Sequence, residues 1–484
     1  MVRPALVLLA CLLVAASSLA QSLELTECRI SSGPGAPSMK ARCGTLVRPL
    51  DPEGSVPGEI SLRVAVVSAL NLSPRRDPLV PIAGGPGQGS IQFYTSYSHG
   101  FETVRRNRDI LLVDQRGTGE SSRMDCPVDD DLVEGQYSAE LTVEYTNDCL
   151  QQLPFDPRFF TTSVAVTDLE AVRVALGYPS LNLYGVSYGS RVAQHFARRY
   201  PSSTRTVILD GVVPPQISLG PEIATESQRA VDTILARCAE DSGCLEAFPN
   251  VEATFQRVVA ELRESPVTID MPHPNTGRFE KRVFGQSELA VAVRLLAYQP
   301  NSIALLPMLI HEAGAGNFVP LGSQFMMTMT AMRDTLSLGM HNAVMCTEDS
   351  PFYDSAKIDY DGIARTYMGI MQLKALEAIC SVWPAGPIDP DFKTPLSTDL
   401  PVLLLSGDAD PITPPRYAEM AAVRLGNARH LIGKYQGHGQ ITVGCNQRLV
   451  AEFIDSADPA AVDPSCLERS FVMPFFVDFS GPLP

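Results

Sequence analysis

The chain has 484 residues, a formal net charge of −16 and a hydrophobic content of 45%. A chain of this length exceeds one compact core, so we expect a large domain with an insertion or a second domain. Lys and Arg form no basic block, which argues against nucleic acid as a partner.

The first twenty residues have the pattern of a leader. Arg3 precedes the apolar run Ala5–Ala16, and the small residues of Ser17-Ser18-Leu19-Ala20 follow. This pattern predicts a secretory signal peptide over 1–20 and a secreted or periplasmic protein without a stable membrane span after cleavage. A membrane anchor is one alternative, although the run is short for a bilayer. A lipoprotein signal ending at Cys11 is another, although it would cut the apolar run in half.

Ten cysteines remain beyond Cys11, and an oxidising compartment favours disulfides. They fall into near neighbours along the chain, so sequential pairing is the simplest arrangement, but spacing alone does not fix connectivity. The five neighbouring pairs are Cys28 with Cys43, Cys126 with Cys149, Cys238 with Cys244, Cys346 with Cys380, and Cys445 with Cys466.

The sequence offers no metal-binding pattern, and we expect no metal and no cofactor. It contains no C-x-x-C and no Cys/His cluster. His311-Glu312 lacks the second histidine with which H-E-x-x-H binds zinc from one helical face.

Strand patterns begin the mature chain. Ile60–Val66 alternates between apolar and polar or small residues, and Val47–Leu50 is expected to pair with it. The short apolar runs Leu79–Ala83 and Ile110–Val113 predict buried strands. Pro81 cannot donate a ladder hydrogen bond, so its strand should be short or bulged there.

Helices and strands then alternate, which predicts a parallel sheet. The expected order is a helix over Ala165–Leu176 ending at Gly177, a strand over Leu181–Tyr184, a helix over Val192–Tyr200, and a strand over Thr206–Leu209.

Farther along, Val213 to Asp391 reads as mainly helical with no clear strand series, and a strand pattern resumes at Val402–Leu405. We therefore predict an α/β fold with a mostly parallel central sheet flanked by helices. Its two parts, 21–212 and 392–484, are separated by a helical insertion over 213–391.

Residues Gly185-Val186-Ser187-Tyr188-Gly189 spell G-x-S-x-G between a predicted strand and a predicted helix. In that context the turn exposes the hydroxyl of Ser187 as a nucleophile, and the helix directs its positive dipole end at a developing oxyanion. The alternative is a glycine-rich turn without chemistry.

A serine nucleophile needs a base and a group that orients the base. His438 stands between Gly437 and Gly439 in a predicted loop, which is a poor setting for a core residue. Asp410 follows a predicted strand and is the expected acid, with Asp408 as its rival. The order serine, aspartate, histidine is that of hydrolases with this elbow.

The glycine-rich segment Gly84–Gly89 follows the strand at Leu79–Ala83. It lacks the G-K-[ST] of a phosphate loop, so we interpret it as an oxyanion loop. The amide of Gly85 would act together with the amide of Tyr188, the residue after the nucleophile. A plain turn is the alternative.

Taken together, these motifs carry a family resemblance. The chain resembles the α/β-hydrolase family of prolyl aminopeptidases and, more closely, its secreted tripeptidyl aminopeptidase-like branch. The resemblance implies a serine peptidase that acts on free N-termini, with Ser187, Asp410 and His438 as a triad. Ala83 departs from it, because many members have histidine there. The matching motifs are CGTLVRPLD, AGGPGQGS, DQRGTGES, LYGVSYGSR, ILDGVVPP, CTEDSPF, CSVWP, LSGDADPITPP and GHG.

The resemblance also makes 213–391 a cap over the site, where it would exclude water and select substrates. An aminopeptidase needs a carboxylate for the substrate ammonium, and Glu348 and Asp349 are the candidates; the alternative is a solvated acidic turn. A helical stripe is expected in the core rather than in a pliable substrate wall. It consists of Phe325, Met329, Met332 and Leu336.

The expected reaction starts with attack of Ser187 on a scissile carbonyl. His438 takes the proton and later gives it to the leaving amine, Asp410 orients His438, and water hydrolyses the acyl-enzyme. Two alternatives remain. The same triad would serve a carboxylesterase, and the fold could also carry a catalytically silent binding protein, although such a protein would have no reason to retain the nucleophile, acid, base and oxyanion loop together.

Overall fold

The computed structural model describes residues 23–33, 35–126, 138–273 and 276–482. The predicted signal peptide and Cys11 lie outside the described residues, so the leader stays a prediction. Within the described ranges, no helix combines the length and apolarity needed to cross a bilayer.

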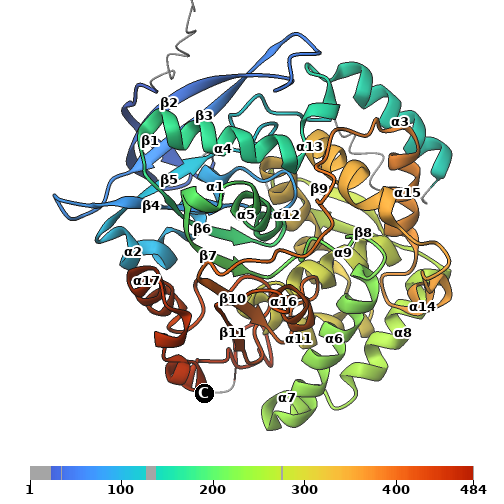
Figure 1. Cartoon of the computed structure of the whole chain (residues 1–484). Helices are drawn as coiled ribbons and strands as arrows, with labels where there is room; N and C mark the ends of the chain where they lie inside the picture. Colours follow the sequence, from blue (N-terminus) through green and yellow to red (C-terminus); the bar gives the residue numbers. More distant parts are fainter. Residues whose placement is uncertain (1–22, 34, 127–137, 274–275, 483–484) are drawn as a thin grey trace, which may run out of the picture.

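One nine-stranded sheet forms the centre of the molecule, in the order β1-β2-β3-β5-β4-β6-β7-β10-β11 (Figure 1). Its first strands pair antiparallel as far as β5, and all later pairs are parallel. The strands are β1 (Thr26–Ser31), β2 (Ser38–Pro49), β3 (Glu59–Val67), β4 (Arg75–Ile82), β5 (Arg108–Val113), β6 (Leu181–Val186), β7 (Thr204–Asp210), β10 (Val402–Gly407) and β11 (Ala428–Gly433).

The sheet agrees with the predicted strands and extends most of them. Val47 pairs with Ser61 across the β2–β3 hairpin, as the alternation pattern predicts. The irregularity that was expected at Pro81 lies earlier in β4, where the register with β5 shifts between Arg75 and Leu79. The β4–β5 register ends at Leu79, so Pro81 pairs only with β6, and its missing amide costs no ladder bond toward β5.

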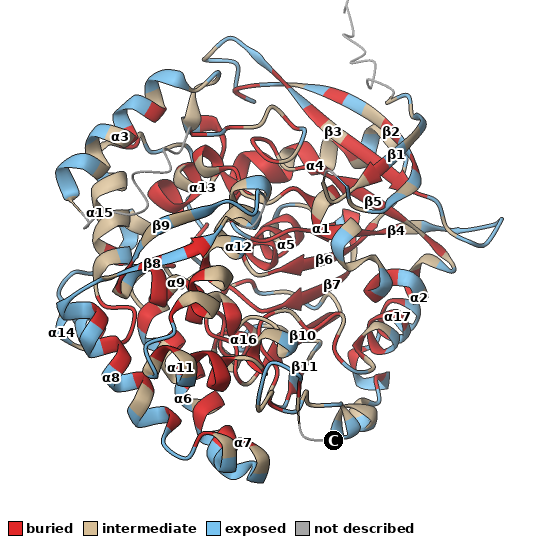
Figure 2. Cartoon of the chain, turned by 180° about the vertical axis from the view of Figure 1, so that it is seen from behind, coloured by how far each residue is buried: buried red, intermediate tan, exposed pale blue. Residues whose placement is uncertain are grey.

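Helices cover both faces of the sheet. Successive residues of a strand point to opposite faces, so each strand contributes side chains to the cores on both sides. Val64 and Val66 lie in the core beneath α4, α5 and α16, whereas Ala65 and Val67 lie in the core beneath α1 and α17. Figure 2 shows the buried strands between exposed outer helix faces. The helices of this part are α1 (Ser90–Tyr97), α2 (Glu102–Arg105), α3 (Ala139–Gln152), α4 (Thr162–Leu176), α5 (Tyr188–Arg199), α16 (Pro415–Ala422) and α17 (Asn446–Ser456).

The chain between β7 and β10 is a mainly helical region, which we call the cap region. It has its own hydrophobic core, formed largely by residues between Ala224 and Leu373. Its helices are α6 (Ile223–Glu240), α7 (Ser242–Ala247), α8 (Val251–Glu264), α9 (Gln286–Leu296), α10 (Pro300–Ile303), α11 (Leu306–Gly314), α12 (Val319–Thr335), α13 (Leu338–Val344), α14 (Tyr360–Arg365) and α15 (Met371–Val382).

The expectation that this region lacks a strand series needs a correction. It contains the antiparallel hairpin of β8 (Val267–Pro272) and β9 (Phe279–Phe284). In β8 the buried Ile269 and Met271 alternate with exposed neighbours, which is the period of a half-buried strand. The run is short and stands between long helices, so the helical patterns around it dominate the sequence.

A shared hydrophobic core fastens the cap region to the rest of the chain. Met340, Val344 and Trp383 are buried in the same core as the strand residues of the central sheet. All five sequential disulfides are present, and that of Cys346 with Cys380 joins two parts of the cap region.

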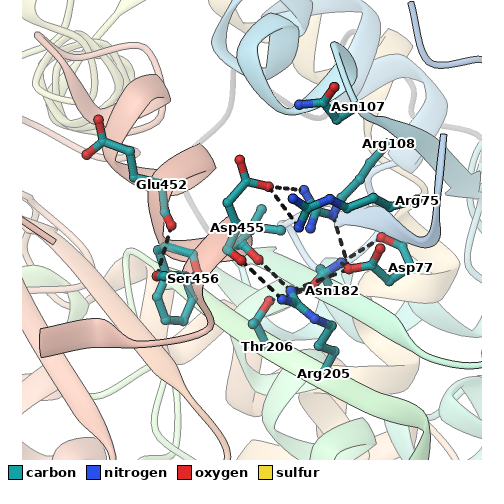
Figure 3. A network of polar contacts seen from close by, with 12 residues as sticks. Arg75, Asp77, Asn107, Arg108, Asn182, Arg205, Thr206, Glu452, Asp455 and Ser456 are labelled. Carbon is teal, nitrogen blue, oxygen red and sulfur yellow. Dashed lines mark hydrogen bonds and ion pairs between the residues drawn. The ribbon is translucent and has the colours of Figure 1, made fainter. Parts of the chain in front are cut away.

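A polar network closes the sheet at the end where its parallel strands begin (Figure 3). Arg108, buried at the start of β5, donates to Asp77 at 3.1 Å and to Asp455 at the end of α17. Arg205 of β7 donates to Asn182 of β6 at 3.1 Å and to carbonyls at the end of α17. Side chains at this end therefore tie four strands, β4, β5, β6 and β7, to the last α-helix.

Candidate active site

Ser187 occupies the turn between β6 and α5 with φ of +55°, a backbone region that non-glycine residues rarely adopt. Glycines permit this turn because neighbouring backbone fills the space that a Cβ would need. A Cβ on Gly185 would lie 2.2 Å from the carbonyl oxygen of Gly189, and one on Gly189 would lie 2.2 Å from that of Ile82. The strained serine at the start of a helix is the geometry that the G-x-S-x-G motif predicts.

The predicted base, His438, contacts the predicted acid, Asp410. Nδ1 of His438 lies 2.8 Å from Oδ2 of Asp410, whose carboxylate also accepts the amides of Ile412 and Thr413. Asp408 does not compete for the imidazole, because its Oδ1 accepts the amide of Tyr435 at 2.6 Å. Of the two aspartates, the structure therefore brings Asp410 to the histidine.

Burial disfavours the charged form of His438, but the neighbouring Asp410 outweighs it, and the imidazole pKa is raised above its usual value. Asp210 contributes in the same direction and Arg294 opposes both. The pKa of Asp410 is lowered despite burial, because His438 and hydrogen bonds from Thr413 favour the carboxylate. The buried pair is thus arranged to hold an imidazolium beside a carboxylate.

The loop between β11 and α17, residues 434–445, carries His438, and we call it the histidine loop. It lies beside the strand ends that carry Ser187. The amide of Ser187 donates to the carbonyl of Asp210 at 2.9 Å, which places the serine next to Gly211. A Cβ on Gly211 would lie 2.9 Å from Cε1 of His438. A Cβ on Gly439 would meet Cγ2 of Val186 at 4.0 Å. The imidazole therefore lies at the same sheet edge as Ser187.

The predicted oxyanion loop also touches Ser187. A Cβ on Gly84 would lie 2.9 Å from the serine Cβ, so only glycine fits at this approach. Gly85 follows with φ of +106°. Tyr188 begins α5 and buries its ring, with its hydroxyl 2.6 Å from Oγ1 of Thr162. The two predicted oxyanion residues thus belong to two segments that both adjoin Ser187.

Asp210 is a site residue that the sequence reasoning missed. Its buried carboxylate accepts the amides of Gln440 and Ile441 and the hydroxyl of Tyr184. Desolvation raises its pKa to about 6. The only sequence signal is an acidic residue at the end of an otherwise apolar strand, ILD, which marks a buried charge that needs partners.

The environment of Glu348 and Asp349 matches neither of the two interpretations from the sequence, which were a carboxylate for the substrate ammonium and a solvated acidic turn. Both are fully buried in a π-helical turn, Met345–Asp349, so they are not a solvated acidic turn. Asp349 accepts two hydrogen bonds from Arg191, at 2.9 and 3.0 Å. Glu348 accepts the amide and the hydroxyl of Thr162, at 2.6 and 2.9 Å.

These contacts assign the two carboxylates to the protein interior rather than to a bound ammonium. Desolvation raises the pKa of Glu348 to about 7, so burial weakens its charge at neutral pH. Their burial could not be predicted from the sequence, because the acidic pair interrupts no periodic pattern.

The Met-rich stripe divides between core and cavity. Phe325 is buried in the core of the cap region, and Met329 packs against that core. Met329, Met332 and Leu336 also line a cavity of about 290 Å³. Leu336 reaches the oxyanion loop, where its Cδ1 would lie 3.1 Å from a Cβ on Gly85. The side of the stripe near α13 is therefore adjacent to the candidate site.

No group of three or more His, Cys, Asp or Glu side chains in the described ranges could hold a metal ion. The arrangement offers a serine, an imidazole and a carboxylate at one sheet edge. That set is suited to nucleophilic attack by an oxygen whose proton the imidazole accepts.

Two family models match the chain. Residues 77–257 match the alpha/beta hydrolase fold, and residues 366–466 match TAP-like protein. The first match includes the elbow at Ser187, and the second includes Asp410 and His438. The chain is an enzyme of the α/β-hydrolase fold.

Several curated relatives of this hydrolase are peptidases by name. Serine protease Hip1 of Mycobacterium tuberculosis is 28% identical over 461 residues, covering 85% of each chain. Tripeptidyl aminopeptidase of Streptomyces coelicolor is 26% identical over 211 residues, covering 39% of each chain. Among solved structures, proline iminopeptidase of Mycobacterium smegmatis gives a TM-score of 0.37 at 15% identity, covering 90% of this hydrolase and all of that chain.

Proposed function

We propose that this hydrolase is an exported serine exopeptidase that releases residues or short peptides from free N-termini. Ser187 attacks the scissile carbonyl, His438 transfers the proton, and Asp410 orients the imidazole. The amides of Gly85 and Tyr188 stabilise the oxyanion. The observation that carries the proposal is the 2.8 Å contact between His438 and Asp410 at the sheet edge where Ser187 holds φ of +55°.

The choice of a peptide substrate is supported by the relatives, whose names are serine protease, tripeptidyl aminopeptidase and proline iminopeptidase. Export is supported by the leader pattern of residues 1–20 and by five disulfides, which persist in oxidising compartments. The helical insertion predicted over 213–391 would cover the site as a cap.

A substrate panel tests the peptidase assignment. Free-amine prolyl, alanyl and tripeptidyl anilides are compared with the same anilides blocked at the N-terminus and with nitrophenyl esters. We expect turnover of at least one free-amine anilide and loss of turnover when its amine is blocked. Turnover of esters alone would instead identify a carboxylesterase.

The nucleophile is tested separately with a fluorophosphonate probe, which reacts with an activated serine. We expect labelling of the wild-type chain and none of Ser187→Ala. Persistent labelling of that variant would place the nucleophile elsewhere, and no labelling of either protein would favour a silent binding protein.

A further inference from the structure

The cap region bonds directly to the loop that carries the acid. We define the acid loop as Asp408–Pro411. Arg229 of α6 donates to the main-chain carbonyls of Asp408 and Asp410, at 2.9 and 2.8 Å. Two residues earlier in the same helix, the buried Ser227 donates its hydroxyl to the carbonyl of Pro411 at 3.0 Å. One cap helix therefore holds three carbonyls of this loop.

A second cap segment holds the histidine. The amide of His438 donates to the carbonyl of Tyr298 at 2.7 Å, and Nε2 of Gln299 donates to the carbonyl of His438 at 3.2 Å. The ring of Tyr298 meets the imidazole edge-on, with centroids 4.9 Å apart. Two consecutive residues between α9 and α10 thus bond both main-chain polar groups of the proposed base.

A third cap segment holds the oxyanion loop. The amide of Ser337 donates to the carbonyl of Gly87 at 3.0 Å. Nδ1 of His341 in α13 lies 3.2 Å from the carbonyl of Pro86, within hydrogen-bonding reach. Leu336 forms an antiparallel bridge with Gln88. These contacts come from a stretch of six residues that begins where α12 ends.

Close approach of the cap backbone explains why two of the loop residues are glycines. A Cβ on Gly437 would lie 2.4 Å from the carbonyl oxygen of Tyr298. A Cβ on Gly87 would lie 2.6 Å from that of Ser337. Real Cβ atoms do not come this close to backbone, so any side chain there would separate the cap region from the loop. The glycine before His438 thus makes room for the cap region.

We propose that the cap region is a docked part of the catalytic site, in which Arg229, Gln299 and His341 are positioning residues. They bond main-chain atoms of the acid, histidine and oxyanion loops and touch none of the proposed reacting side-chain atoms. The region stays docked on these loops during turnover, because lifting it would break bonds to all three. The inference rests on the proposed function of Ser187, His438 and Asp410.

The test uses variants that remove the bonds of one side chain to a catalytic loop, with controls that remove the bonds of one side chain inside the cap region. Gln299→Ala loses the bond to His438, and its control Gln286→Ala loses a bond to the carbonyl of Tyr367. Arg229→Gln loses the bonds to the acid loop, and its control Arg263→Gln loses a bond to the carbonyl of Thr366.

The first measurement is the second-order rate of fluorophosphonate labelling, which needs the triad but no peptide recognition. We expect both test variants to label about 10- to 100-fold more slowly, since a displacement of about 1 Å at a catalytic group costs about 10²-fold. The controls should label within about twofold of the wild-type chain, since they leave these loops in place. Urea midpoints should match within each pair, which separates positioning from a general loss of stability.

The second measurement is amide hydrogen exchange of the segment that contains His438. We expect slow exchange in the wild-type chain and in Gln286→Ala, and faster exchange in Gln299→Ala. Test variants that label as fast as their controls, or a His438 amide that exchanges as fast as exposed loops, would overturn the proposal. Failure of the proposed function itself would appear differently, as labelling that survives Ser187→Ala.

Discussion

Both carboxylate oxygens of Asp210 lie 2.8 Å from the amide nitrogen of Gln440, two residues after the proposed base. The main-chain carbonyl of the same aspartate accepts the amide of Ser187. One buried residue at the end of β7 therefore fixes Ser187, the proposed nucleophile, through its backbone and the histidine loop through its side chain.

Replacement of this side chain should misplace His438. In Asp210→Asn, one side-chain oxygen becomes an NH₂ group that faces backbone amides and cannot accept from them. We expect kcat/KM to fall about 10- to 100-fold, the scale of a displacement of about 1 Å at a catalytic group. Tyr184→Phe is the matched control, because it removes only the tyrosine hydroxyl from the same carboxylate. Equal losses in the two variants would contradict a specific role in holding the loop.

The pH dependence of activity should report the contact between His438 and Asp410. The imidazole acts as a base only when neutral, so kcat/KM rises as pH increases through its pKa. Because Asp410 raises that pKa, we expect the acid limb of the profile above the usual histidine value. Asp410→Asn should move the limb to lower pH and reduce kcat by about 10⁴-fold, since the imidazole loses its orienting partner. An acid limb that stays in place would exclude Asp410 as the partner.

The geometry of Glu348 and Asp349 predicts how their amide variants behave. Both carboxylates bond protein groups and neither is exposed, so we expect no specific loss of free-amine substrates. Glu348→Gln and Asp349→Asn should change KM for a free-amine anilide and for a nitrophenyl ester by similar factors. A KM increase confined to the free-amine substrate would instead restore the ammonium-binding role that the sequence predicts.

The sequence predicted the parallel sheet, the elbow and the pairing of His438 with Asp410, because each leaves a local mark. Apolar runs mark buried strands, and glycines mark close approaches. Burial of Glu348 leaves no such mark, and the run ILD marks Asp210 as a buried charge without identifying its partners. Both residues depend on partners more than 100 residues away in the chain, Thr162 and Gln440. Nor could the sequence predict that cap segments bond the catalytic loops through main-chain atoms.

Burial of Glu348 should also make stability depend on pH. Its pKa is raised to about 7 in the folded chain, mainly by desolvation, whereas an unfolded glutamate titrates near 4.5. The folded chain therefore binds more protons between these values, and the free energy of unfolding falls as pH rises from about 4.5 to about 7. Glu348→Gln removes this titration, so its melting temperature relative to wild type should be higher at pH 8 than at pH 5.

The control for that measurement is Glu377→Gln, which changes a partly exposed carboxylate of the cap region that pairs with Lys374. Its melting temperature relative to wild type is measured at the same two pH values as the reference for a carboxylate that keeps contact with solvent. Scanning calorimetry at both pH values checks the prediction. The melting temperature of Glu348→Gln relative to wild type could instead be the same or lower at pH 8 than at pH 5. That result would show that burial does not raise the pKa of the Glu348 carboxylate.

The network at the opposite end of the sheet should contribute stability without affecting chemistry. Arg108 is buried and bonds both Asp77 and Asp455, so Arg108→Met removes the guanidinium that the two carboxylates share and leaves them only their weaker pairs with Arg205 and Arg75 (Figure 3). Breaking a buried ion pair from one side costs about 3–5 kcal/mol, and exposure of Asp455 places the expected loss at the lower end, about 3 kcal/mol. Urea unfolding should show that loss, while KM and the acid limb of the pH profile stay at wild-type values because the network lies where the strands begin. Arg448→Met, which breaks an exposed pair with Glu452 on α17, should change the free energy of unfolding by less than about 1 kcal/mol. Equal destabilisation by the two variants would contradict the assignment of the buried network as the stabilising contact.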